Sequence, residues 1–273
     1  ANSSLQGGAI HLRNSIATLI NPLLHGNSVD DEGGAIAIYD NSDVEIIGGR
    51  FWDNNALGYG GAVSIRNLGP TPFIVRRNEF HGNISATSGG GMAIIGTQAS
   101  GMIANNTFVD NTAVEHGASF FAEPSTSESG IWYWANIDAH SNGLSSVKLS
   151  ESANASLAFS TCHAPSTVCF NMPAAANQYQ NVDGEQETYG ASDPLFVGYS
   201  DNNTPTDDDF RLTPSNPFDQ ELCPIPWTPP SSCSASVNSG PPNGLGPGFF
   251  TTWDDEDGST NNRGHTGGPV VLS

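Results

Sequence analysis

Basic residues are scarce in this chain. Its 273 residues include 8 Lys and Arg against 28 Asp and Glu, so the formal net charge at pH 7 is -20. Nucleic acids and anionic membrane surfaces are recognised largely through Lys and Arg side chains, so we expect no nucleic-acid partner. Charged residues make up only 13% of the chain, about half the usual share. Asn, Ser, Thr and Gly must therefore cover much of the surface, which favours turn-rich β structure.

Long apolar runs are also missing, and cysteines are few. No stretch approaches the roughly 18 apolar residues of a transmembrane helix, so we predict no membrane span. The four cysteines form two close pairs, Cys162 with Cys169 and Cys223 with Cys233, neither with C-x-x-C spacing. Two short-range disulfides are the simpler interpretation, and they predict an extracellular or cell-surface location. The alternative is four buried free thiols.

An internal repeat fills the first half of the chain. The string GGAIHL begins at Gly7, GGAIAI at Gly33, GGAVSI at Gly60 and GGGMAI at Gly89. A degenerate fifth copy, HGASFF, begins at His116. We expect each Gly pair to form a bend that needs positive φ or a close approach between repeats. In the fifth copy we expect His116 to replace the first Gly and the regular coil to loosen.

A second pattern lies between these strings, namely an apolar residue, two variable residues and an Asn. Its copies end at Asn27, Asn54, Asn83 and Asn111. Repeats of 20 to 50 residues are typical of solenoids, in which equivalent residues stack above one another. We therefore predict that these four asparagines form a structural ladder of side-chain amides along the axis.

Within each repeat, apolar and polar residues alternate with the period of a β-strand. We expect Ile10, Ile36, Val63 and Met92 to line one interior, and intervening residues such as Ser64 to face outward. Residues 44–47, 73–75 and 101–104 supply further strands. The fold class is therefore predicted to be all-β, a right-handed parallel β-helix with coils of about 27 residues. The alternative is an antiparallel sandwich with fortuitous turn spacing.

The expected domain organisation is one β-helix followed by a tail. The β-helix spans residues 1–222, with regular coils over 7–142 and irregular coils over 143–222. Residues 223–273 are rich in Pro, Gly and Ser, a composition typical of an extended segment. We expect this C-terminal tail to pack on its own coil or on a neighbouring subunit.

The combination of GGA[IV] with F-x-x-N resembles the repeat of bacterial polymorphic outer-membrane proteins, over roughly residues 7–142. The resemblance implies a pectate-lyase-like β-helix of a secreted surface protein, because members are mostly adhesins, autotransporter passengers or anchored surface proteins. The DPLF and DFRL strings of residues 191–219 are similar to the last coils of many secreted bacterial β-helix proteins.

Catalytic signatures are weak. We expect no catalytic residue, because the arginines of the strand segments show no repeated position beside clustered carboxylates. Arg76 and Arg77 are interpreted as solvated or paired with Glu79. A glycosidase needs two carboxylates in one cleft, and Asp53 and Asp110 hold equivalent positions, but they are better interpreted as turn residues. A polysaccharide lyase or glycoside hydrolase remains the minor alternative.

Calcium is the one cofactor that the acidic clusters suggest, since oxygen-rich loops on an acidic chain suit a divalent ion. Residues 30–32 form an additional acidic cluster, and solvated acidic turns are the alternative for every cluster. The candidate ligands are Asp254, Asp255, Asp257, Asp207, Asp208 and Asp209.

Surface contacts and glycosylation complete the candidate sites. Large aromatic residues on an outer face suit subunit packing or sugar stacking, and burial beneath the tail is the alternative. The candidate interface residues are Trp132, Trp134, Phe120, Phe249, Phe250 and Trp253. N-x-[ST] sequons, which matter only if the source glycosylates secreted proteins, occur at Asn2, Asn83, Asn105, Asn154 and Asn202.

These features predict a non-enzymatic structural or adhesive protein of the extracellular surface. We expect it to form a homo-oligomer or filament, or a layer, through its β-helix ends, its tail and its exposed aromatics. The alternative is a monomeric β-helix that binds or degrades surface carbohydrate.

Overall fold

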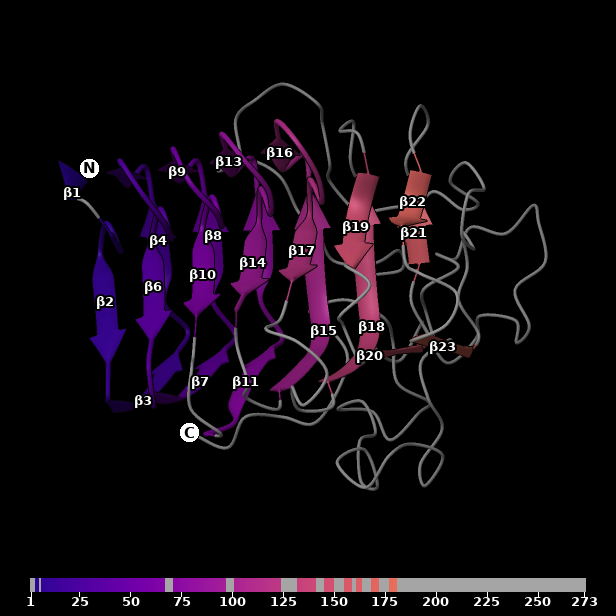
Figure 1. The fold of residues 1–273 in the computed structure, drawn as a ribbon, viewed down its shortest axis with the longest axis horizontal. Coiled ribbons are helices and arrows are strands. Elements are labelled where there is room, and N and C mark those ends of the chain that lie inside the picture. Colours follow the sequence, from indigo (N-terminus) through magenta and orange to yellow (C-terminus); the bar gives the residue numbers. More distant parts are fainter. Residues whose placement is uncertain are drawn as a thin grey trace, which may run out of the picture.

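The computed structural model is an all-β parallel solenoid (Figure 1). It describes residues 3–4, 6–66, 71–96, 101–123, 132–140, 145–149, 155–158, 161–163, 168–171 and 177–180. Within these residues there is no helix, and none therefore that is long and apolar enough to cross a membrane. The coils stand side by side along the long axis of Figure 1, beginning at the N-terminus.

Each coil consists of three or four short strands. Coil 1 contains β1 (Ser3–Ser4), β2 (Ile10–Arg13), β3 (Ile16–Ile20) and β4 (Leu23–His25). Coil 2 contains β5 (Ser28–Val29), β6 (Ile36–Tyr39), β7 (Asp43–Ile47) and β8 (Arg50–Trp52). Coil 3 contains β9 (Asn55–Ala56), β10 (Val63–Arg66), β11 (Phe73–Arg76) and β12 (Glu79–His81). Coil 4 contains β13 (Ile84–Ser85), β14 (Met92–Ile95) and the long β15 (Gly101–Val109).

Later coils continue the same arrangement. Coil 5 contains β16 (Thr112–Ala113), β17 (Phe120–Glu123) and β18 (Trp132–His140). The remaining described strands are β19 (Ser145–Leu149), β20 (Ala155–Ala158), β21 (Thr161–His163), β22 (Val168–Asn171) and β23 (Asn177–Gln180).

Three parallel sheets run along the solenoid. The narrow sheet has the order β1-β5-β9-β13-β16, and the second has the order β2-β6-β10-β14-β17-β19-β22. The third joins β3, β7, β11, β15, β18, β20 and β23, with β4, β8, β12 and β21 paired beside this path. The register of the second sheet places Ile36, Val63 and Met92 directly beside one another. The prediction of a parallel β-helix is thereby confirmed.

Columns of like apolar side chains form the core. Ile36, Val63 and Met92 are completely buried, as predicted. Behind them, the rings of Phe51, Phe80 and Phe108 stack with centroids 4.9 Å and 4.7 Å apart, each ring one coil from the next. Such ring pairs add roughly 0.5–1.5 kcal/mol beyond the apolar area that they bury.

The two glycines of each pair have different functions. The first adopts positive φ, for example 69° at Gly33 and 70° at Gly60. The second lies so close to the next coil that a Cβ on Gly61 would collide with the carbonyl oxygen of Gly90. In coil 5 the positive φ, 61°, belongs to Gly117.

The alignment of the fifth repeat therefore needs a correction. His116 pairs with Ser88, the residue before the glycine run of coil 4, and does not replace the first Gly. Gly117 is that first Gly, and Ala118 stands where the earlier coils have the second one. The regular register continues through this point, because Phe120 lies beside Met92.

The outer face of the second sheet also differs from expectation. Ala37, Ser64 and Ala93 alternate with the interior residues, yet they too are buried. Side chains from the preceding loops lie over this face: Glu32 contacts Ser64, and Tyr59 packs with Ala93 and Phe121. Loops that fold over the strands thus give these coils a second, smaller buried layer.

Candidate functional site

The asparagine ladder runs through coils 2 to 5 on the inside of the turn. The backbone N and side-chain Nδ2 of Asn27 both donate to Oδ1 of Asn54, at 3.2 and 2.9 Å. Asn54 donates in the same way to Asn83, and Asn83 to Asn111. The second Nδ2 hydrogen of Asn83 goes to the carbonyl oxygen of Phe51. Every amide therefore points in one direction along the axis.

A second ladder was not expected from the sequence. The backbone N of Gly49 donates to Oδ1 of Asn78 at 2.7 Å, and the N and Nδ2 of Asn78 donate to Oδ1 of Asn106. Both asparagines are buried. The signal that could have revealed them is an Asn two residues before the Phe in RNEF and NNTF.

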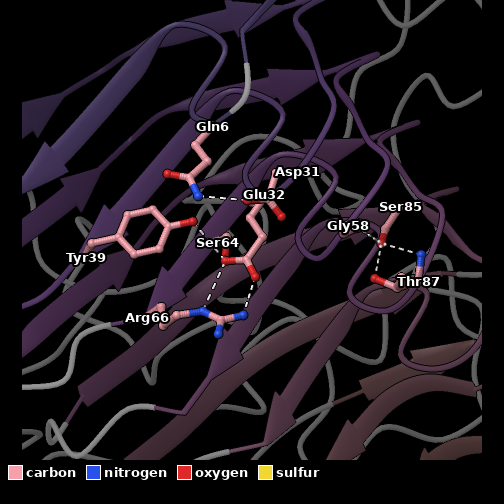
Figure 2. A network of polar contacts seen from close by, with 9 residues as sticks. All are labelled: Gln6, Asp31, Glu32, Tyr39, Gly58, Ser64, Arg66, Ser85 and Thr87. Carbon is pink, nitrogen blue, oxygen red and sulfur yellow. Dashed lines mark hydrogen bonds and ion pairs between the residues drawn. The ribbon is translucent and has the colours of Figure 1, made fainter.

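A buried polar network lies at the loop between β5 and β6 of coil 2 (Figure 2). The carboxylate of Glu32 pairs with the guanidinium of Arg66 and accepts hydrogen bonds from the Tyr39 hydroxyl at 3.0 Å and the Ser64 hydroxyl at 3.3 Å. Glu32 is buried, so these partners replace the water that its charge would otherwise need. Burial, and after it the charge of Glu32, raises the pKa of the Tyr39 hydroxyl far above its usual range.

Neighbouring polar contacts fix the same loops. Nε2 of Gln6 donates to a carboxylate oxygen of Asp31 at 2.7 Å, and the Ser85 hydroxyl donates to the carbonyl oxygen of Gly58 at 2.7 Å, as Figure 2 shows. Within the acidic cluster at residues 30–32, Asp31 thus binds Gln6, whereas Glu32 binds Arg66. Among the described residues, no group of three or more His, Cys, Asp or Glu side chains is arranged to hold a metal ion.

The arginines bind acids on other coils. Arg13 pairs with Asp40 at 3.0 Å, and Arg50 pairs with Glu79 at 2.9 Å. Arg76 pairs with Glu45 at 3.1 Å, so the expected pairing of Arg76 with Glu79 is wrong. In all four pairs of this kind, counting Arg66 with Glu32, the charged groups link different coils.

A repeated basic position does exist, contrary to our expectation. The register places Arg13 and Arg66 on either side of Tyr39, in one column of the second sheet. The Arg13 guanidinium lies 5.6 Å from the centre of the Tyr39 ring. Acids accompany both arginines, but the resulting contacts are ion pairs between coils.

Imidazole and indole rings form a column on the outer side of the third sheet. His25 stacks on Trp52 with centroids 4.3 Å apart, and His81 is the next residue in register. The Arg50 guanidinium lies 5.9 Å from the Trp52 ring centre. Nε2 of His81 is 3.8 Å from a carboxylate oxygen of Asp110. The sequence marks this column, because His25, Trp52 and His81 all occupy the first variable position of the F-x-x-N copies.

The turn interpretation of the second variable position agrees with the backbone. Asp53 has φ of 53° and Asp110 of 50°, and the two glycines of the same column, Gly26 and Gly82, have 62° and 59°. Asn and Asp tolerate this left-handed region better than other residues with a side chain. The carboxylates thus occupy turns, and each alternates with a glycine of the adjacent coil.

Three residues predicted as surface sites are buried instead. Phe120 is completely buried in the core, beside Met92 and Val147, and offers no contact surface. Asn83 and Asn105 are also buried, and Nδ2 of Asn83 donates a hydrogen bond to Asn111 in the ladder. The folded protein therefore leaves no room for a glycan on either residue. The other sequons, Asn2, Asn154 and Asn202, lie outside the described residues.

Other predicted site residues fall at strand positions whose side chains are not described, or outside the described residues. Trp132 pairs with Gly101 and Trp134 with Ile103, at register positions that are interior in coils 2 to 4. Cys162 is in β21 and Cys169 in β22. The residues outside the described part are Cys223, Cys233, Asp207, Asp208, Asp209, Phe249, Phe250, Trp253, Asp254, Asp255 and Asp257.

Coil 1 exposes apolar side chains that later coils bury. Ile20 is 52% exposed, whereas Ile47, its neighbour in register, is 3% exposed. Ile16 and Leu23 are 88% and 63% exposed, at outward positions where coil 2 has Asp43 and Arg50. No family model, curated protein or solved structure matches the chain.

Proposed function

We propose that this chain is a non-enzymatic structural or adhesive protein of the extracellular surface, whose rigid β-solenoid assembles into a filament or layer. One observation carries the proposal: the polar groups best suited to chemistry are used to hold coil to coil. Arg13, Arg50, Arg66 and Arg76 each pair with an acid of another coil. Both asparagine ladders run along the same axis.

Such cross-coil bonding suits a load-bearing rod. In a solenoid each repeat contacts only its neighbours, so stability depends on the bonds between successive coils. Satisfied buried networks also fix a single arrangement of their members. The resemblance to the repeat of polymorphic outer-membrane proteins, which we propose as the family, points to the same adhesive or structural class.

Electron microscopy of the purified chain tests this function. We expect negatively stained preparations to show filaments or a layer at micromolar protein concentration, and sedimentation to show mass that increases with concentration. Uniform monomers across the whole concentration range would refute assembly. A matched incubation with polysaccharide, assayed for new reducing ends or unsaturated products, would reveal an enzyme instead.

Location and cofactor form part of the proposal. An extracellular protein should carry Cys162–Cys169 and Cys223–Cys233 as disulfides. Thiol titration of the denatured, unreduced protein should then find no free thiol, and four thiols would contradict the pairing. For calcium at the clusters near Asp208 and Asp255, calorimetric titration should show binding that EDTA abolishes.

Carbohydrate binding is the second candidate, and the Trp52 column favours it. Trp52 is partly exposed on an outer face, with the Arg50 guanidinium close by. Indole rings bind the apolar faces of sugars. Retention of the protein on insoluble polysaccharide should fall for Trp52→Ala and persist for Trp52→Phe. Equal retention of both variants would leave this candidate without support.

A further inference from the structure

An apolar row lies on the outer face of the narrow sheet, where β9, β13 and β16 run side by side (Figure 1). The register continues past these strands, because the backbone N of Ala86 donates to the carbonyl oxygen of Ala56, and that of Val114 to that of Ser85. Leu57, Ala86 and Val114 are therefore neighbours in coils 3, 4 and 5. Leu57 and Val114 are 57% and 65% exposed.

The fold does not require apolar residues on this face. In coil 2 the row holds Asp30, which is exposed and lies beside Leu57. Next to the row, Ile84 is 47% exposed in a column that is otherwise polar. Polar residues thus fit both columns. Because the exposed apolar residues of coils 3 to 5 are grouped rather than scattered, they indicate a contact surface.

Acidic side chains flank this surface at both ends. Asp30 precedes Leu57 in the row, and Glu115 directly follows Val114 in the chain; both acids are exposed. Residues 28–30, 55–57, 84–86 and 112–116, which form this side of coils 2 to 5, include no Lys or Arg. On a chain of formal net charge -20, such a surface favours a basic partner.

The spacing of the row favours a helix as the occupant. Neighbouring strands of a sheet are about 4.8 Å apart, which is close to the roughly 5.4 Å between successive turns of an α-helix. An amphipathic helix aligned with the row places one apolar side chain over each coil and directs Lys or Arg toward Asp30 and Glu115. A second copy of the same face would oppose like charges, and the described residues of this face include no aromatic ring for a sugar.

We infer that the outer face of the narrow sheet is a docking surface for a basic amphipathic helix of another protein. This partner goes beyond the proposed function, because its binding needs no filament. Leu57, Ile84 and Val114 cover the apolar stripe of the helix, while Asp30 and Glu115 select a basic helix over an acidic one.

A designed peptide tests the surface directly. The probe is a fluorescein-labelled helical peptide of Leu and Lys, with Leu at the i, i+3, i+4 and i+7 spacing of one helix face. Its controls are a scrambled peptide of the same composition and a helical Leu/Glu peptide. Fluorescence anisotropy at about 0.15 M salt screens unspecific attraction to the acidic chain. We expect the probe to bind roughly tenfold more tightly than either control; equal binding of the scrambled peptide would overturn the inference.

Neutral substitutions then locate the binding. Leu57→Ser with Val114→Ser removes the apolar row, and Ile16→Ser with Leu23→Ser is the matched control, at positions 88% and 63% exposed on third-sheet strands of coil 1. We expect roughly tenfold weaker binding of the probe by the first variant and parental binding by the second. Circular dichroism checks that both keep the β fold. Equal binding by the two variants, or no binding by the parent chain, means that the docking surface is wrong.

The flanking acids and the identity of the occupant have separate tests. Asp30→Asn with Glu115→Gln should weaken binding of the probe more than Asp43→Asn with Asp53→Asn, which removes two exposed acids elsewhere. Equal weakening would contradict a selective role for the flanking acids. Sedimentation velocity without peptide addresses the second copy. Self-association of Leu57→Ser with Val114→Ser that equals that of the parent supports a different partner, whereas its loss would show that a second copy occupies the surface.

Discussion

Coil 1 and coil 3 have similar sequences but different surroundings. Leu24 and Phe80 belong to one interior column, yet Leu24 is partly buried while Phe80 lies between two other rings. Arg13 and Arg66 belong to one outer column, but the acid that Arg66 binds is buried and the acid that Arg13 binds is not. A repeat thus determines which strand forms, and its neighbours determine how much that strand contributes to stability.

This difference follows from strand pairing. In coil 3 each strand pairs with a strand of coil 2 on one edge and a strand of coil 4 on the other. Its backbone groups are therefore hydrogen-bonded on both edges, and its interior side chains are covered on both sides. In coil 1, among the described residues, β2, β3 and β4 each pair on one side only. Coil 1 therefore gains less stability from neighbouring coils than coil 3 does.

The largest difference should come from the phenylalanine column. Removing the ring in Phe80→Ala opens a cavity between Phe51 and Phe108 and should cost about 3–5 kcal/mol of unfolding free energy. Leu24→Ala, at the open end of the column, should cost about half as much because the site is already partly solvated. Urea unfolding followed by circular dichroism measures both. Equal losses would show that coil 1 is as well covered as coil 3.

The asparagine ladder should show the next largest contrast. Asn83→Ala removes the acceptor of two buried Asn54 donors, its backbone N and its Nδ2, each worth about 1–3 kcal/mol, while the backbone N of residue 83 still donates to Asn111. Asn27→Ala should cost less, because among the described residues the Asn27 side chain donates to Asn54 and accepts no hydrogen bond. Asn83→Asp provides a sharper probe, since its carboxylate must face the oxygens of Phe51 and Asn111, and it should unfold at lower urea than Asn83→Ala. The reverse order would contradict the assigned amide orientation.

The sequence predicted the strands and their stacking because both are encoded locally. Alternation over four to six residues marks a strand, and the recurring Gly pair and Asn give the length of a coil. The register error at His116 has a simple origin: GGGMAI contains three glycines, so the fifth copy can be aligned in two ways. The pairings of Ser88 with His116 and of Met92 with Phe120 resolve the ambiguity.

The polar network was beyond prediction for a different reason. Glu32 and Arg66 are 34 residues apart, which is longer than one coil, so no repeat period connects them. They meet because a loop folds over the outer face of β6 and β10, and the small residues there, Ala37 and Ser64, leave room for it. By contrast, the Arg50–Glu79 pair spans one coil and could have been found by aligning the repeats.

The two arginines of one outer column allow a buried ion pair to be compared with an exposed one. Arg66→Met removes the charged partner of buried Glu32 and should cost about 1.5–3 kcal/mol, the range for hydrogen bonds to charged groups. Arg13→Met breaks a solvent-exposed pair and should cost less than about 1 kcal/mol. Thermal unfolding at low and high salt measures both changes. If Arg66→Met loses as little unfolding free energy as Arg13→Met, and the loss depends on salt, then water reaches Glu32.

The smallest effect should appear at alkaline pH, through Tyr39. Its pKa is raised in the folded protein by burial and by Glu32, so the unfolded chain gives up this proton first, near pH 10. Stability from the protonated hydroxyl is thus fully present below about pH 10 and declines as pH rises toward the folded pKa. Tyr39→Phe should flatten that decline in unfolding experiments between pH 9 and 11. Tyr59→Phe is the control: the Tyr59 pKa is raised as well, by burial and then by Glu123, but Tyr59 is less buried. If both variants flatten the decline equally, the Glu32 network does not account for the alkaline sensitivity.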